Sequence, residues 1–356
     1  MKDIIVKSKK IGDSQPVFII AEMAWSHDGS VENARRIIKG AAQAGADAIS
    51  LHITSMRDYM VGNYGRSVGQ GLSARGGKER IYDYLSRMNL EDRDWEKLFS
   101  YAKGLNLAVC AMPNDMQSVR LCRKLDPDMY VVAAACFVEE NLVSEIAKQG
   151  KPVILRIGGA TLGEIENTVN LIRKHSGEGI ILLHGIQLYP TQLEDTRLRL
   201  IPSLKSIFGL PVGLADHVDA ESELALMIPI MAIGIGAVVI EKHLTHNRSL
   251  RGLDTEAALN PDEFKRFVKY LREAEKALGT AYFDKLSRAG LEYRSVSRKR
   301  VVASKRIRKG QRVTRNTIAF KRAPEGIYPD ESRFVVGRTV NQDIKENDPI
   351  TWDKLL

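Results

Sequence analysis

Side chains that can do acid–base or metal chemistry follow the ends of several apolar runs in this sequence. Five of the seven histidines lie at such ends, namely His27, His52, His184, His217 and His243. Histidine exchanges a proton near neutral pH and is the commonest metal ligand in proteins. The placement therefore favours a single site assembled from the ends of several strands, rather than histidines scattered over a surface.

His217 and His243 end two consecutive apolar runs, so their imidazoles can converge on one divalent ion. Two histidines with nearby carboxylates and open positions suit Mn, Fe, Zn or Co. Glu241 precedes His243 by two residues, which places both side chains on the same side of a strand. The alternative is that each histidine is a hydrogen-bonded structural residue. A pair at neighbouring strand ends favours the metal site, and both interpretations stay open here.

The elements that must position these residues are eight short apolar, β-rich runs with amphipathic helical stretches between them. This alternation predicts parallel βα units, and eight units over about 250 residues favour a (β/α)8 barrel, whose active site lies at the carboxyl ends of the strands. A doubly wound sheet is the alternative, but no G-x-G-x-x-G follows the first run. The predicted strands are residues 17–22, 46–53, 107–112, 130–135, 152–157, 179–185, 210–216 and 237–243, and the clearest helices are 31–44, 91–104 and 261–279.

The last part of the chain differs in composition from the rest. From residue 296 onward there are 15 Lys and Arg against 7 Asp and Glu, which accounts for most of the net charge of +9. Short alternating stretches with Gly and Pro predict a small β-rich domain. We therefore expect a barrel domain at 1–280, a linker at 281–297 and a second domain at 298–356, which is too small to bury much surface alone and should pack on the barrel or on a partner chain.

Composition also limits the classes of protein. No apolar run is long enough to cross a membrane, and the opening MKDIIVKSKK has no apolar signal core. Three cysteines make no disulfide framework. We therefore expect a cytoplasmic protein with a small-molecule substrate. Nucleic acid is a poorer partner for the basic tail, because the tail has few aromatic residues to stack bases.

Several segments at these strand ends resemble the motifs of one family, the sialic acid (N-acetylneuraminate) synthases. The matches are co-linear over nearly the whole chain, and the tail resembles the family's antifreeze-like (SAF) domain. The segments are AEMAWSHDG (21–29), LYPTQLEDTRL (188–198), GLADH (213–217), IEKHLT (240–245), LDTEAALNPDEF (253–264) and, in the tail, VVASKRIRKGQRVTRNTIAFKRAPEGI.

The resemblance implies a TIM barrel followed by a SAF domain, in a domain-swapped homodimer. It implies an enzyme that condenses phosphoenolpyruvate with an N-acetylated hexosamine, N-acetylmannosamine or a relative, to give a nine-carbon 2-keto sugar acid. It also implies a divalent metal ion, Mn or Mg. The residues that it implies are His217 and His243 for the metal, Glu22, His27 and Glu241 for catalysis, and Tyr189, Asp216, Asp254 and the partner copy's Arg322 for the sugar.

The family's phosphoenolpyruvate contacts are poorly matched. A Lys and a Gln of the second strand are Ser50 and His52 here, and the STG of the fifth strand is Arg156-Ile157-Gly158. The polar groups of the third and fourth strands become apolar ones. A phosphate trianion needs cations and donors, so His52 and Arg156 become the candidate replacements. Further basic residues follow in the long loop after the second strand, namely Arg57, Arg66, Arg75 and Lys78.

Three hypotheses follow from this contrast. The first is a synthase with a rebuilt phosphoenolpyruvate site. The second is a metal-dependent sugar-acid aldolase or lyase that no longer uses phosphoenolpyruvate, and the third is a non-catalytic sugar-binding paralogue. The kept cluster of Glu22, His27, His217, Glu241 and His243 argues against the third hypothesis, because a non-catalytic copy has no need of it.

Overall fold

The computed structural model describes residues 2–66, 79–176, 179–280 and 285–356. The chain divides into two compact units, Met1–Gly279 and Thr280–Leu356. Each unit has a hydrophobic core of its own. Within the described residues no helix is long and apolar enough to span a membrane.

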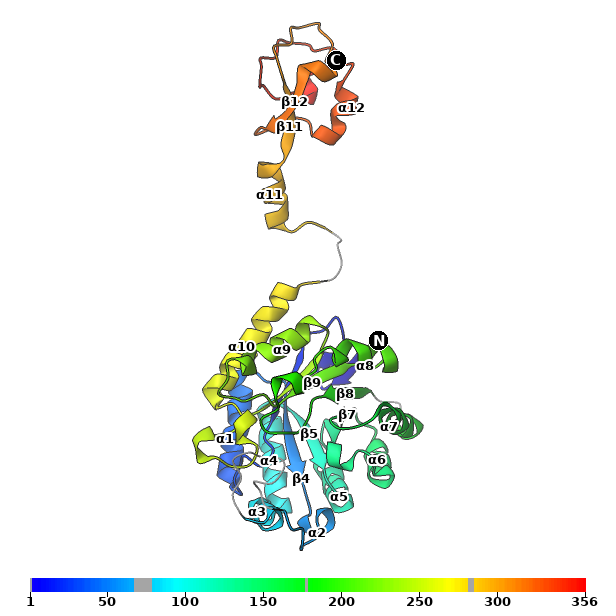
Figure 1. The fold of residues 1–356 in the computed structure, drawn as a ribbon, viewed down its shortest axis with the longest axis vertical. Helices are drawn as coiled ribbons and strands as arrows, with labels where there is room; N and C mark the ends of the chain where they lie inside the picture. The colour runs from blue at the N-terminus through cyan, green and yellow to red at the C-terminus, as the bar shows by residue number, and fades with distance from the viewer. Residues whose placement is uncertain (1, 67–78, 177–178, 281–284) are drawn as a thin grey trace. The chain divides into compact units, whose positions relative to one another are not determined.

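The first unit is a closed barrel of eight parallel strands, as the sequence predicts (Figure 1). The strands follow one another around the barrel in chain order, and the last pairs with the first. Each predicted apolar run contains one strand or overlaps it closely. The strands are β3 (Phe18–Glu22), β4 (Ala48–Ile53), β5 (Ala108–Pro113), β6 (Met129–Val132), β7 (Val153–Arg156), β8 (Ile180–His184), β9 (Val212–Asp216) and β10 (Val239–His243).

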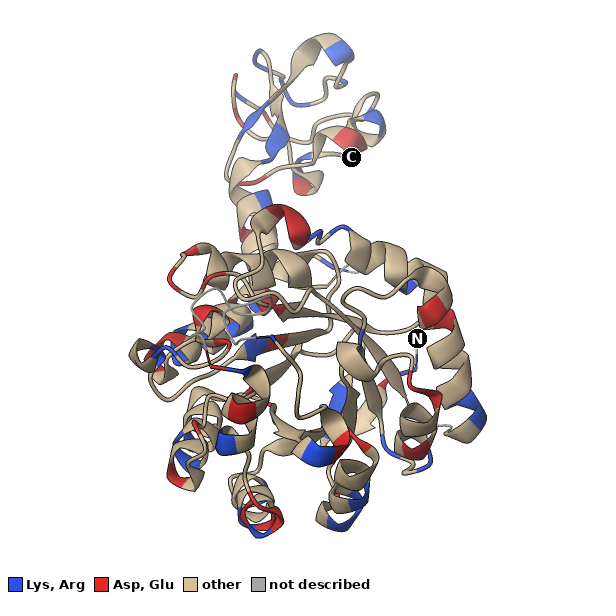
Figure 2. Cartoon of the chain, turned by 60° about the horizontal axis from the view of Figure 1, so that its bottom comes forward, with Lys and Arg blue, Asp and Glu red and all other residues tan. Residues whose placement is uncertain are grey.

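Helices surround the strands and cover the outer face of the barrel (Figure 1). The first of them begins after Ser30, whose side chain accepts a hydrogen bond from the backbone N–H of Asn33, and ends at Gly45 in the left-handed conformation. Most charged residues lie on these helices and on the loops (Figure 2). The helices are α1 (Val31–Ala44), α4 (Asp92–Gly104), α5 (Met116–Leu125), α6 (Glu140–Ala147), α7 (Leu162–His175), α8 (Leu200–Phe208), α9 (Leu224–Gly234) and α10 (Pro261–Leu278).

The period of two along each strand divides the core into two layers. Outward-facing residues such as Leu214 and Ile240 pack against the helices, whereas inward-facing residues such as Ala215 and Val239 fill the barrel. This alternation decides which polar residues at the strand ends can meet inside the barrel.

An N-terminal hairpin, β1 (Ile4–Val6) with β2 (Lys9–Ile11), was not predicted from the sequence. Ile4 and Ile11 belong to the same cluster as the inward-facing residues, so the hairpin closes one end of the barrel. Gly179 permits this packing, because a Cβ there would lie 2.2 Å from Ile4. With that end closed, chemistry is confined to the carboxyl ends of the strands.

The long segment after β4 is partly helical. It contains α2 (Met56–Tyr59) and α3 (Ile81–Met88), which pack with Trp25 and Leu253 in a small apolar cluster. Residues 67–78 lie outside the described part of the chain, so the structure does not address the basic residues Arg75 and Lys78.

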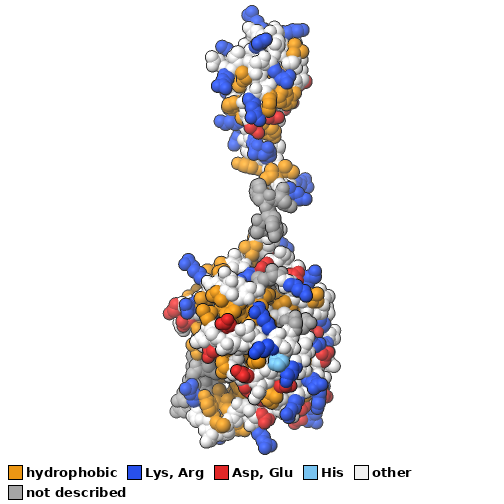
Figure 3. Space-filling model, turned by 90° about the vertical axis from the view of Figure 1, so that its right-hand side faces the viewer, with side chains coloured by type: hydrophobic (Ala, Val, Ile, Leu, Met, Phe, Trp, Pro, Cys, Tyr) orange, Lys and Arg blue, Asp and Glu red, His pale blue; other side chains and the backbone are white. Residues whose placement is uncertain are grey.

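The second unit begins with a helix where the sequence predicts a linker and continues into a β-rich domain. Its buried residues include Val301, Val313, Val340 and Ile350. Lys and Arg side chains lie over the face of this unit seen in Figure 3. Its elements include α11 (Arg288–Ser297), β11 (Lys299–Ala303), β12 (Ile318–Arg322) and α12 (Ser332–Val335).

Candidate active site at the carboxyl end of the barrel

Three buried charged residues meet inside the barrel. Glu22 ends β3, Arg156 ends β7, and Glu241 lies on β10. One guanidinium nitrogen of Arg156 lies 2.5 Å from a carboxylate oxygen of Glu22 and 2.7 Å from one of Glu241. Arg156 is 3% exposed and both carboxylates are 0% exposed, so the three form an ion-paired triad without access to solvent.

The two carboxylates of this triad differ in their affinity for a proton. Burial disfavours the charged form of Glu22, but Arg156 and His52 outweigh it and hold the pKa of Glu22 well below its ordinary value. Burial raises the pKa of Glu241 to about 7, against the opposing effect of Arg156 and with the support of Glu22. Glu22 is therefore a permanent anion, whereas Glu241 can hold or release a proton near neutral pH.

The two histidines that the sequence singles out lie together. The rings of His217 and His243 are 5.1 Å apart, and the Tyr189 ring lies 4.8 Å from the first and 5.2 Å from the second. Burial lowers the pKa of His217 to about 3. Burial, and then His217, lower the pKa of His243 well below its ordinary value. Both imidazoles are therefore neutral, the form in which histidine binds a metal.

The hydrogen bonding of this pair suits metal binding. His217 Nδ1 lies 2.8 Å from the carbonyl oxygen of Ile186. Because a carbonyl can only accept, Nδ1 carries the proton and Nε2 keeps its lone pair. Neither this Nε2 nor either nitrogen of His243 has a hydrogen-bond partner among the described residues. The same residues contain no group of three His, Cys, Asp or Glu that could hold a metal, so the pair offers two ligands.

Asp254 also belongs to this end of the barrel. It lies in the loop after β10, 5% exposed, with a left-handed backbone φ of 64° that Asp tolerates better than most residues. Burial, together with the charges of Glu256 and Glu22, raises the pKa of Asp254 to about 8. A carboxyl group that stays protonated at neutral pH can donate a hydrogen bond to a ligand oxygen.

His52 and His27 lie on one side of the triad. His52 Nε2 is 3.3 Å from Glu22 Oε1, so His52 adds to the interactions that fix this carboxylate. His27 is 1% exposed, and its ring contacts those of Trp25 and Trp95. No described residue forms a hydrogen bond with His27 Nε2. The structure thus brings His52 into direct contact with the triad but places His27 in an aromatic wall beside it.

Asp216 is the sequence-predicted residue that the structure places elsewhere. Its carboxylate pairs with Lys242 at 2.7 Å, and both side chains are buried. Asp216 shares the outward orientation of Leu214, and Lys242 that of Ile240, whereas His217 and His243 face the other way. The structure thus gives Asp216 an ion pair between β9 and β10, and its contact with the sugar stays a prediction.

Arg322 ends β12 in the second unit and is exposed. It borders a hollow of about 420 Å³ that Ser295, Val296, Ala323 and Pro324 also line. Arg322 is thus accessible to a ligand or a partner, and its role toward a sugar stays a prediction.

The inner positions of the neighbouring strands are apolar. Met112 on β5 and Val131 on β6 face the barrel interior with Cys110, and Ala133 packs against them. Ser50 on β4 is fully buried, and no described residue forms a hydrogen bond with its hydroxyl group. Arg156 is therefore the only cation among these residues, and two carboxylates already surround it.

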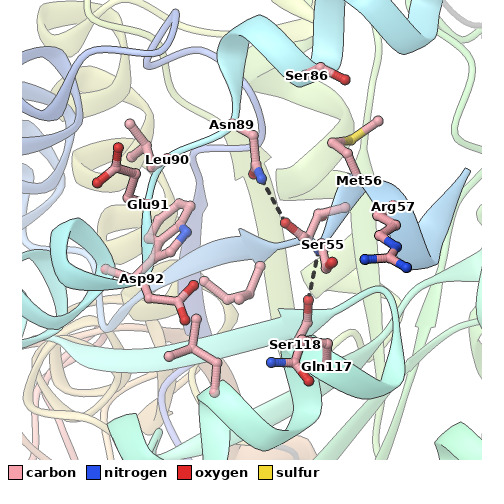
Figure 4. Close-up of a pocket in the computed structure, with 14 residues that line it drawn as sticks. Ser55, Met56, Arg57, Ser86, Asn89, Leu90, Glu91, Asp92, Gln117 and Ser118 are labelled. Carbon is pink, nitrogen blue, oxygen red and sulfur yellow. Dashed lines mark hydrogen bonds between the residues drawn. The ribbon is translucent and has the colours of Figure 1, made fainter. Parts of the chain in front are cut away.

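A cavity of about 550 Å³ lies next to this site but does not include the triad or the histidine pair (Figure 4). It opens between α4 and α5 and is lined by Ser55, Arg57, Asp92 and Gln117 among others. Asn89 projects from the α3–α4 connection and donates a hydrogen bond to the backbone of Thr54. Trp95, whose ring contacts that of His27, also lines this cavity.

Sequence reasoning missed two residues that help to build the site. Trp25 lies between His27 and His52, with ring centroids 6.1 and 6.2 Å away. His246 Nδ1 donates a hydrogen bond of 3.0 Å to the backbone carbonyl oxygen of Ser26, which holds the loop after β10 against the loop after β3. Trp25 could have been found from the sequence, because it is an aromatic residue just beyond the end of an apolar strand. His246 lies beyond the end of β10, and no sequence pattern marked it as a site residue.

Acid–base groups and paired imidazoles at the carboxyl end of a (β/α)8 barrel are typical of barrel enzymes. In this protein a small β-rich domain follows the barrel. The chain matches the NeuB family over residues 37–282 and the SAF domain over residues 298–356. It belongs to the NeuB family. The matched range begins after Glu22 and His27. Their assignment to the site therefore depends on their position in the barrel and not on this family match.

Relatives of known sequence and structure agree with this assignment. Pseudaminic acid synthase of Campylobacter jejuni is 32% identical over 94% of this chain and 95% of its own length. The uncharacterized protein MJ1065 of Methanocaldococcus jannaschii is 31% identical over 100% and 99%. The crystal structure of N-acetylneuraminic acid synthetase from Leptospira borgpetersenii, in complex with citrate, is 28% identical and has a TM-score of 0.72, covering 82% of this chain and 96% of that one.

Proposed function

We propose that this protein is a synthase that condenses phosphoenolpyruvate with an N-acetylated hexosamine, N-acetylmannosamine or a relative, to give a nine-carbon 2-keto sugar acid and phosphate. The observation that carries the proposal is the buried cluster at the carboxyl end of the barrel, where the histidine pair adjoins the triad of Glu22, Arg156 and Glu241. His217 Nε2 and both ring nitrogens of His243 have no hydrogen-bond partner among the described residues. Buried polar groups without partners are the mark of a site that a ligand completes.

The reaction joins C3 of phosphoenolpyruvate to the aldehyde carbon of the open-chain sugar, while water adds at C2 and phosphate leaves. A divalent metal, Mn or Mg, held by His217 and His243 would polarise the aldehyde oxygen. Glu241, with its pKa near 7, gives a proton to that oxygen as it becomes a hydroxyl group. Glu22 stays ionised and accepts a hydrogen bond from a sugar hydroxyl, while Tyr189 and Asp254 line the sugar.

A second function is favoured by the apolar inner positions Met112, Val131 and Ala133. Among the described residues of the strands, Arg156 is the buried cation on the inner side of the barrel, and Glu22 and Glu241 already neutralise it. A phosphate trianion would gain little there. A metal-dependent aldolase or lyase, which cleaves a 2-keto sugar acid to pyruvate, requires the histidine pair and the triad but no phosphate contacts.

The test is an assay of metal-loaded protein with phosphoenolpyruvate and N-acetylmannosamine, following released phosphate and the keto acid by mass spectrometry. We expect His217→Ala to lower kcat at least about a hundredfold, because it removes one of two metal ligands. The matched control His175→Ala, an exposed residue at the end of α7, should leave the rate unchanged.

The alternative results separate the hypotheses. Cleavage of a nine-carbon keto acid to pyruvate, with no use of phosphoenolpyruvate, would establish the second function in place of the first. Sugar binding without turnover in either direction would overturn both and identify a binding protein. The domain-swapped homodimer, the contact of Arg322 with the sugar, the role of His27 and the cytoplasmic location remain predictions from the family resemblance.

A further inference from the structure

Three arginines gather around one tyrosine in the second unit. The guanidinium carbon of Arg300 lies 3.7 Å from the ring centroid of Tyr328, and those of Arg294 and Arg298 lie 5.4 and 5.9 Å from the same centroid. Arg294 and Arg298 come from the end of α11, and Arg300 comes from β11. We call these four residues the arginine cluster.

The arginine cluster contains more positive charge than its surroundings balance. None of the three arginines forms an ion pair with a carboxylate in the described ranges of the chain. The ion pair of the second unit within those ranges joins Arg306 to Asp343. Glu331 is near, but its carboxylate accepts a hydrogen bond from the backbone N–H of Tyr328. The second unit as a whole is basic, and Lys and Arg side chains are numerous on the face of it seen in Figure 3.

Arg300 is the residue that distinguishes this cluster from an ordinary basic surface. It is 7% exposed, and its Nε has no hydrogen-bond partner among the described residues. Gly326 leaves room for its side chain, because a Cβ at that position would lie 3.1 Å from the Cβ of Arg300. A buried guanidinium without a counterion is costly, and stacking on one phenol ring offsets only about 1–2 kcal/mol of such a cost.

The strand pairing adds to the imbalance. Arg300 lies directly opposite Lys321 on β12, and like charges in opposed positions destabilise a sheet. The carbonyl groups at the end of α11 favour the nearby cations Arg294 and Arg298, whereas Arg300 lies in the next element, β11. An anion bound at the cluster would satisfy all three guanidiniums at once.

We propose that the arginine cluster is a binding site for a phosphate dianion, either inorganic phosphate or the phosphate group of a small phosphate ester. The planar guanidinium offers paired N–H donors that match the spacing of phosphate oxygens, and Arg is the residue most used for this purpose. Hydrogen bonds and charge from Arg300 and Arg294 lower the pKa of the Tyr328 hydroxyl, which makes it a stronger donor to a phosphate oxygen beside them. This site lies wholly within the second unit and does not rest on the function proposed for the barrel.

The experiment is a calorimetric titration of the full-length protein with inorganic phosphate at fixed ionic strength. The variant Arg294→Gln/Arg298→Gln removes two partly or fully exposed charges and leaves Arg300 and the fold in place. The control Arg308→Gln/Arg315→Gln removes two exposed charges elsewhere in the same unit. We expect saturable binding that the first variant weakens about tenfold or more and that the control leaves unchanged.

Two further arms locate the site and identify the source of the phosphate. Binding should persist in His217→Ala/His243→Ala, since these residues are in the barrel; its loss there would place the phosphate in the barrel and overturn the proposal. Absence of saturable binding, or an equal loss in both arginine variants, would overturn it as well. Phosphoenolpyruvate, a small phosphate ester, should compete with phosphate for the site. If a single-stranded DNA oligonucleotide binds more tightly than phosphate, and Arg294→Gln/Arg298→Gln abolishes that binding, the cluster serves nucleic acid instead.

Discussion

Asp254 shows how strongly burial changes single residues at the carboxyl end of the barrel. Burial and the neighbouring carboxylates of Glu256 and Glu22 raise its pKa from 3.8 to about 8. A carboxyl group whose pKa is higher in the folded than in the unfolded state contributes stability that is complete below the unfolded pKa. That contribution is lost as the pH rises through the folded pKa, so Asp254 makes the metal-free protein less stable between those two values as the pH increases.

We therefore predict that Asp254→Asn, which cannot titrate, reduces this loss. The melting temperature of the variant relative to that of the wild type should rise from about pH 4 to about pH 8, between the unfolded and the folded pKa of Asp254, and level off above that range. Thermal unfolding without added metal measures it. Asp126→Asn is the control, because the pKa of this exposed acid is lowered by Lys151 and does not cross that range. A constant difference between wild type and Asp254→Asn would contradict the prediction.

At the same scale, the period of two along a strand was the sequence signal that best indicates the direction of a side chain. Alternation places Glu241 and His243 on one face of β10 and therefore predicts that they meet inside the barrel. The same alternation puts Asp216 opposite to His217, but the family motif suggested a sugar contact for it. The ion pair of Arg156 with Glu22 joins residues 134 positions apart, so no local pattern could reveal it.

Among the elements, β4 is anchored by the residue that precedes it. Asp47 is 5% exposed and forms an ion pair with Lys9 of β2. Its other carboxylate oxygen accepts hydrogen bonds of 2.7 Å from the backbone N–H of Ile19 in β3 and from Arg272 in α10. One carboxylate thus ties the N-terminal hairpin, two strands and the last helix of the barrel together.

We predict that Asp47→Asn lowers the free energy of unfolding by about 2 kcal/mol, because it removes the charge that two cations share while keeping an acceptor for Ile19. Urea denaturation measures this. The control Asp83→Asn breaks the exposed pair with Arg80 and should cost less than about 1 kcal/mol. Equal effects of the two substitutions would show that Asp47 does not organise these elements.

The eight strands were predictable because strands buried on both faces read as short, nearly continuous apolar runs. Helix α1 matches its predicted range of 31–44, since a Ser N-cap and a terminal Gly mark both of its ends. The hairpin of β1 and β2 was missed, because its strands have three residues each and mix exposed with buried positions. Helix α11 buries no residue, so it lacks the one-sided apolar pattern that identifies a helix.

The whole molecule consists of two units with separate cores. Helix α10 is the last element of the first unit, and its buried face of Phe264, Phe267, Val268 and Leu271 belongs to the core of the barrel. A chain that ends at Gly279 therefore contains the whole core of the barrel. A chain that ends at Leu259, just before α10, lacks the part of the core that this helix supplies.

We predict that a protein comprising residues 1–279 folds cooperatively, whereas one comprising residues 1–259 does not. The shorter protein would expose the large apolar surface that α10 covers, at about 25 cal/mol for each Å². Circular dichroism and scanning calorimetry on both proteins test this. Failure of residues 1–279 to unfold in a single transition, under conditions where the full chain does, would mean that the barrel depends on the second unit for its stability.

Arg156 also constrains how this sequence can change over evolutionary time. Each member of its triad is the counterion of another, so replacing Arg156 alone by a serine would leave Glu22 and Glu241 buried together without a cation. The effect of a substitution at any of the three positions is thus conditional on the other two, which is epistasis in the strict sense. An engineer who wishes to restore phosphate contacts on β7 must therefore redesign these three positions as a set.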